Sequence, residues 1–186
     1  MRVLADLGYI VDCSVTPFVS WTHHEGTIGG GPDFTQADVW PYFLDEGNVC
    51  HPGTSDVLEV PVTIVPSPLF RRMPGTFRRL RTLRRSAVGR LAGRICDIEP
   101  HWFRPYNWMT AGALVSVYEH AVRMELPVIE MMFHSSELMP GCSPYNQDAQ
   151  SIEALYRVLE PLFDKLSTDG CRGVTLSEFA DGVTSS

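Results

Sequence analysis

The sequence lacks the features that mark membrane-spanning, disulfide-rich or nucleic-acid-binding proteins. It contains no apolar run of about eighteen residues, so it encodes no membrane-spanning helix. Its five cysteines lie far apart and include no CxxC pair, which favours reduced thiols and a cytoplasmic location. An excess of positive charge is also missing. The formal net charge of -7 argues against a nucleic-acid partner, because affinity for duplexes comes mostly from Lys and Arg.

The N-terminus lacks the charged and apolar regions of a signal peptide. Val3, Leu4 and Leu7 instead share one face of a predicted helix that Gly8 ends. A chain that begins inside an amphipathic helix leads us to expect that something precedes it. The 186 residues, 44% hydrophobic and 10% aromatic, predict a single domain over 1–186 with a sizeable core.

The pattern of apolar residues predicts alternating strands and helices. We expect strands at 9–15, 57–65, 126–133 and 173–176, and helices at about 76–94, 110–124, from 146 or 148 to about 169, and 177–180. Pro61 demands an edge position or a bulge in its strand, and Pro161 should kink its helix. The order strand, helix, strand, helix from 126 onward implies parallel βα units and therefore an α/β fold.

The predicted helix at about 76–94 is strongly basic, since nine of the fifteen basic residues fall between 71 and 94. A basic amphipathic helix can lie on an anionic membrane surface or bind a calmodulin-like partner. Alternatively, it is a solvated helix whose arginines pair with the acidic remainder of the chain. The sequence leaves both interpretations open.

His134 directly follows the apolar run LPVIEMMF, at the point where a parallel strand should end and a loop begin. Functional side chains of parallel α/β folds gather at such positions. A histidine there could serve as a general acid or base, because its ordinary pKa lies near neutrality. It could equally be a loop histidine that binds a backbone carbonyl.

Three acidic residues interrupt strand-like apolar runs. Asp12 lies within YIVDCSV, where an unpaired charge would be costly, so it needs a partner. It is either a structural turn residue or the group that orients and stabilises a catalytic histidine. Glu59 and Glu130 could face a barrel interior, cap a sheet edge or pair with an arginine.

Four segments in order, LGYIVDCSVTPFVSW, LEVPVTIVP, MMFHSSELMPGCSPY and VTLSEFA, resemble the polysaccharide deacetylase (NodB-like) family in its WalW-type branch. The resemblance spans nearly the whole chain, and its most specific part is FHSSELMPGxSPY. It implies the C-terminal half of a distorted (β/α) barrel. It also implies a carbohydrate substrate, whose N-acetyl group is removed with the help of a divalent metal, usually zinc.

The resemblance assigns roles to three residues of this chain. His134 falls on the motif whose histidine protonates the departing amine. Asp12 and Trp21 fall in a segment where an Asp supports that histidine and a Trp walls the sugar pocket. The match there is loose, because Ser20 stands before Trp21 where other members often have Asp.

The chain departs from the family in its metal motifs. It contains no Asp-Asp pair, and its six histidines include no pair at i and i+4, so we expect both motifs upstream and no metal bound by this chain alone. Arg104-Pro105-Tyr106 resembles the family's arginine motif but follows the Asp12 segment, and we interpret it as a coincidence. The possible ligands His23, His24, Glu25, Cys50 and His51 match no zinc spacing, and the histidines are predicted to be solvated loop residues.

Three classes of function follow from these observations. The chain is a piece of a deacetylase, a non-catalytic relic of the same fold that binds sugars or a partner, or a membrane-surface module built on the basic helix. Exposed sheet edges would favour self-association or pairing with a companion N-terminal half.

Overall fold

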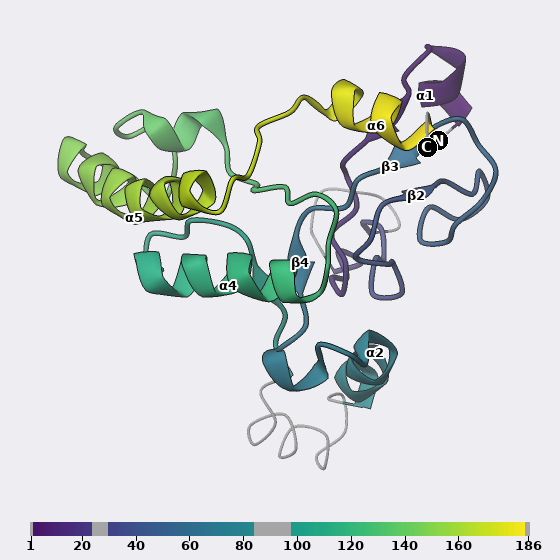
Figure 1. The fold of residues 1–186 in the computed structure, drawn as a ribbon, viewed down its shortest axis with the longest axis horizontal. Coiled ribbons are helices and arrows are strands. Elements are labelled where there is room, and N and C mark those ends of the chain that lie inside the picture. The colour runs from purple at the N-terminus through teal and green to yellow at the C-terminus, as the bar shows by residue number, and fades with distance from the viewer. Residues whose placement is uncertain (1, 24–29, 84–97, 185–186) are drawn as a thin grey trace.

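The computed structural model describes residues 2–23, 30–83 and 98–184, and these form a mixed α/β fold (Figure 1). Its helices are α1 (Arg2–Asp6), α2 (Pro74–Leu83), α4 (Ala111–Arg123), α5 (Ala149–Thr168) and α6 (Leu176–Thr184). Its strands are β1 (Val11–Asp12), β2 (Tyr42–Phe43), β3 (Leu58–Glu59), β4 (Ile64–Val65) and β5 (His101–Trp102). Short 3-10 helices cover Pro68–Phe70 (η1) and Ser135–Leu138 (η2). The described residues contain no closed barrel, and none of their helices is long and apolar enough to cross a membrane.

The strand predicted at 9–15 pairs with the first half of the one predicted at 57–65. β1 runs parallel to β3, and β2 joins the other edge of β3 in the antiparallel sense. The pairing continues past the formal strands, since the Val60 amide donates to the Asp12 carbonyl and the Val62 amide to that of Val15. Pro61 follows β3, and the second half of the run becomes β4, which pairs with β5. The break therefore falls where proline removes an amide donor.

The two longest helices, α4 and α5, pack side by side (Figure 1). Both begin at a side-chain cap: Thr110 accepts the Ala113 amide, and Asp148 accepts the Ser151 amide. The helix α5 runs through Pro161, and Gly170, with a φ of 73°, follows its end. Their buried faces join β4 and α2 in the main core, whose fully buried members include Val65, Phe77, Leu114, Ala121 and Leu162.

Two predicted strands are not strands in the structure. The segment 126–133 is extended but forms no ladder; its Glu130 amide donates to Thr63 Oγ1, and the Thr63 amide donates to the Glu130 carbonyl. The segment 173–176 is also without a ladder, and Leu176 already belongs to α6. None of the residues in these two segments is fully buried, so the apolar runs predicted neither the strands nor full coverage of their side chains. A strand also needs a neighbour with which to pair. The predicted helix at 177–180 therefore starts one residue early, capped by Thr175 and Glu178.

The basic helix is described only in part. The helix α2 covers the first portion of the predicted range, and residues 84–94 lie outside the described residues. Arg78 lies 3.4 Å from Asp38, and Arg81 lies 3.1 Å from Glu99. Arg78 also sits over the ring of Phe18, at 5.6 Å from its centroid. Two arginines of the helix thus have acidic partners within the chain, as the solvated-helix interpretation expects.

Candidate functional site

Asp12 ends β1 directly opposite Glu59 of β3. Its carboxylate accepts a hydrogen bond of 2.7 Å from Ser14 Oγ. Glu59 is fully buried, and its Oε1 accepts the Val15 amide at 3.1 Å, whereas Oε2 forms no hydrogen bond of ordinary length. Burial, aided by the charge of Asp12, raises the pKa of Glu59 to about 9. Glu59 is therefore a neutral acid at pH 7.

Glu130 and Cys13 complete this group, which we call the acidic cluster (Asp12, Cys13, Glu59, Glu130). Burial, together with the charge of Asp12, raises the pKa of Glu130 to about 7, while the Cys13 thiol works in the opposite direction. Burial and the neighbouring Glu130 raise the pKa of Cys13 to about 12, so its thiol is a poor nucleophile at neutral pH. The cluster can hold and exchange protons near neutrality.

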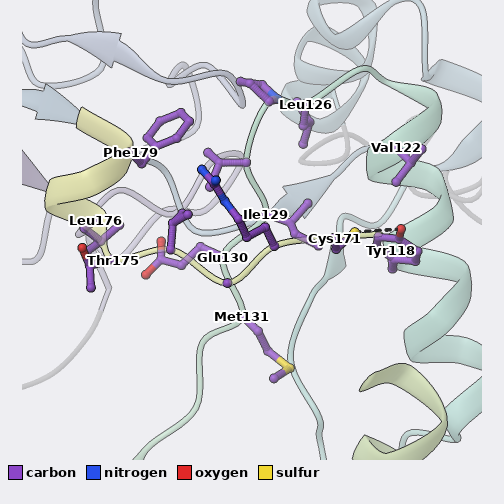
Figure 2. A pocket seen from close by; sticks show the side chains of 15 residues that line it. Tyr118, Val122, Leu126, Ile129, Glu130, Met131, Cys171, Thr175, Leu176 and Phe179 are labelled. Carbon is purple, nitrogen blue, oxygen red and sulfur yellow. Dashed lines mark hydrogen bonds between the residues drawn. The ribbon is translucent and has the colours of Figure 1, made fainter. Parts of the chain in front are cut away.

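A cavity of about 450 Å³ is lined by Glu130, one member of the acidic cluster (Figure 2). Residues 126–131 and 171–176 line it, together with the end of α4 and the start of α6. They include most of the two segments that were predicted to be strands, 126–133 and 173–176. Glu130 lines it opposite Thr175 and Leu176, and Tyr118 closes one end, where its hydroxyl lies 3.2 Å from Cys171 Sγ.

The residues of the acidic cluster do not fit the zinc that the resemblance implies. Over 2–23, 30–83 and 98–184, no three Cys, His, Asp or Glu side chains are arranged to hold a metal ion. His23 and His51 are exposed and Cys50 is buried, while His24 and Glu25 lie outside the described residues. We derive no catalytic step through a metal from these residues.

His134 is exposed on a loop that a buried ion pair holds in place. Its backbone amide donates to Glu137 Oε1 at 2.9 Å, and the same oxygen lies 2.6 Å from Arg104 Nη2. The side chains of Arg104 and Glu137 are only 5% and 2% exposed. The Arg104 guanidinium also sits over the rings of Tyr106 and Tyr145, at 5.1 and 5.4 Å from their centroids. The backbone at His134 is thus held by Glu137, and His134 is an exposed residue at the N-terminal end of η2.

Trp21, the predicted wall of the sugar pocket, lies on the chain after β1 rather than in the acidic cluster. Its indole donates to Thr16 Oγ1 at 2.8 Å, and its ring meets that of Trp102 edge to face at 6.5 Å. In the part of the chain that the structure describes, no hydrogen bond or ion pair joins His134 to Asp12. Glu130 adjoins Asp12, and the four residues from Glu130 to His134 span at most about 14 Å.

Comparison with family models, curated proteins and solved structures gives no match to this chain.

Sequence reasoning missed the role of Arg104. The segment Arg104-Pro105-Tyr106 was interpreted as a coincidence, yet Arg104 is buried, and it fixes the His134 loop through Glu137. One feature of the sequence indicates such a pair. A buried arginine needs an acidic partner, and Glu137 lies within the most specific segment of the resemblance. The partners are 33 residues apart, so no local pattern connects them.

Proposed function

We propose that this chain forms part of a polysaccharide-deacetylase-like hydrolase that removes the N-acetyl group of a sugar or polysaccharide. Its fold would be the C-terminal half of the distorted (β/α) barrel of that family. The observation that carries the proposal is the exposed imidazole of His134 on a backbone held by the buried pair of Arg104 and Glu137. A fixed backbone presents a proton donor in a constant position, as general acid catalysis requires. The free cysteines Cys13, Cys50, Cys142 and Cys171 support a cytoplasmic location.

In this proposal, His134 donates a proton to the nitrogen of the departing sugar amine as its bond to the acetyl carbon breaks. Asp12 stabilises the protonated imidazole, and Trp21 walls the sugar pocket. No hydrogen bond or ion pair joins His134 to Asp12 among the described residues, so that role requires the bound substrate to connect them. The zinc would be held by residues other than those described.

The proposal is tested first on the coding sequence that precedes Met1. In-frame Asp-Asp and His-x-x-x-His motifs would complete the enzyme, whereas their absence would favour a non-catalytic relic that binds sugars or a partner. In the polypeptide that carries these motifs, His134→Ala should lower acetate release from an N-acetylated oligosaccharide by about 100-fold or more. Its zinc content should not change, because His134 is assigned to proton transfer.

The exposed loop residue His23 provides the matched control. His23→Ala should leave both acetate release and zinc content at the wild-type level. Loss of zinc in His134→Ala would show that His134 is a ligand instead, and an unchanged rate would remove it from the mechanism.

A further inference from the structure

A second cavity, of about 500 Å³, lies between β5 and α4 and is rich in aromatic side chains. Trp102, Tyr106 and Trp108 line it, with Met109, Ala113 and Val117 as its apolar wall. We call this cavity the aromatic groove. Glu99 and His101 supply polar groups to the same lining. An apolar pocket with a few polar groups is the usual form of a small-ligand site.

The indole of Trp108 is 72% exposed, yet it is held in place. It stacks on the ring of Tyr106, with centroids 5.0 Å apart and planes only 9° from parallel. The Arg104 guanidinium lies over the Tyr106 ring and is itself paired with buried Glu137. A chain of contacts thus connects an exposed aromatic surface to the interior. Such a rigid platform loses little conformational entropy when a ligand covers it.

The chemistry of the groove suits a neutral carbohydrate. A pyranose ring has apolar C–H faces that stack on flat aromatic rings, and hydroxyl groups at its edge that bind polar side chains such as Glu99 and His101. Tyr and Trp suit such a ligand because each combines an apolar face with a polar atom. The net charge of -7 disfavours polyanions, including the single-stranded nucleic acids that also stack on aromatic rings.

The groove is also connected to the residue that the resemblance places at the sugar pocket. Trp102 lines the groove, and its ring meets that of Trp21 edge to face. Trp102 thus lines the same cavity as Tyr106 and Trp108 and also contacts Trp21. We propose that the aromatic groove binds sugar units of a polysaccharide next to the unit that reacts. The choice of a carbohydrate rests on the proposed function.

The test is a binding titration of this chain with a hexasaccharide of β-1,4-linked N-acetylglucosamine, followed by calorimetry and by tryptophan fluorescence. Trp108→Ala should weaken binding at least tenfold, and Trp108→Phe, which keeps a flat ring, should weaken it less. Tyr156→Ala on α5 is the matched control, since Tyr156 is an exposed aromatic residue outside the groove. It should bind like the wild type. Circular dichroism should show that all variants are folded.

The groove is not a carbohydrate site if the wild type fails to bind the hexasaccharide, or if Trp108→Ala binds it as well as the wild type. Preferential binding of a proline-rich peptide or an oligothymidylate, used as competing probes, would also overturn the assignment. If the hexasaccharide binds in a Trp108-dependent way but the polypeptide that carries the metal motifs releases no acetate, the deacetylase proposal is wrong and the proposal for the aromatic groove stands. If that polypeptide releases acetate but the hexasaccharide does not bind in a Trp108-dependent way, only the proposal for the aromatic groove is wrong.

Discussion

Replacing Glu59 with Gln should make the protein more stable above neutral pH, because Glu59 is held as a neutral acid in the interior. Burial raises its pKa from 4.5 to about 9. Below pH 4.5 the carboxyl is protonated in both the folded and the unfolded chain. As the pH rises toward 9, the unfolded chain loses this proton and the folded chain keeps it, so the stability contributed by Glu59 is progressively lost.

The expected size follows from the shift. Each pH unit between the two pKa values costs about 1.4 kcal/mol, so Glu59 should cost the wild type about 4 kcal/mol between pH 5 and pH 8. Glu59→Gln has nearly the same shape, and its amide oxygen can still accept the Val15 amide. At pH 5 the free energy of unfolding of the variant should therefore lie within about 1 kcal/mol of the wild-type value. As the pH rises to 8, the variant should become progressively more stable than the wild type.

Urea unfolding followed by circular dichroism at pH 5, 6, 7 and 8 measures this difference. Other titrating groups, including Glu130 and His120, contribute to the pH dependence of both proteins, so the comparison isolates Glu59. Glu153→Gln, an exposed change on α5, is the control and should follow the wild type. If the stability curves of Glu59→Gln and the wild type run parallel from pH 5 to pH 8, Glu59 does not carry the shifted pKa.

Two further substitutions test the parts of the structure that position the His134 loop and α5. Arg104→Met should lower the free energy of unfolding by about 3 to 5 kcal/mol, because it leaves the Glu137 carboxylate buried without its partner. Adding Glu137→Leu should recover part of that loss, and a double variant no more stable than Arg104→Met in urea titrations would argue against a buried pair. Asp148→Ala removes the cap of α5 and should lower the midpoint of urea unfolding; an unchanged midpoint would show that the cap contributes nothing.

The helices were predictable from the sequence because their determinants are local. Thr110 and Asp148 cap α4 and α5, and Gly170 adopts the positive φ expected after a helix end. The strands were less predictable because their determinants are not local. The apolar residues at 126–133 predicted a strand covered on both faces, but in the structure they are half-buried or exposed. Among the described residues, the backbone of Glu130 forms its hydrogen bonds with Thr63 alone, and no local pattern indicates this.

The sequence predicted that His134 follows an apolar segment in a loop, but not which residues hold that loop. His134 was identified from its place after an apolar run, and it does lie on a loop. Its anchor could not be found in this way, because the bond between Arg104 and Glu137 joins residues that only the fold brings together. Asp12 was expected to need a partner. In the structure it accepts a hydrogen bond from Ser14 and lies opposite Glu59 in the neighbouring strand.

The segments that carry the family resemblance pack against one another, although they are spread over the sequence. The Asp12 segment pairs with the segment of Glu59, and the backbone of Thr63 joins the latter to Glu130, just before the His134 segment. Leu176 and Phe179 of the last segment pack against Leu58 and Val60.

At the centre of these contacts, Glu59 and Glu130 each bury a carboxylate oxygen that has no hydrogen bond of ordinary length. Such groups cost stability, and shifted carboxyl groups beside a cavity are typical of functional sites rather than of structural cores. The stability of Glu59→Gln therefore bears on function as well. If that variant gains stability at pH 8 and the completed polypeptide loses acetate release, the acidic cluster takes part in the reaction. If it gains stability and keeps full activity, the cluster is not needed for catalysis, and His134 must act without it.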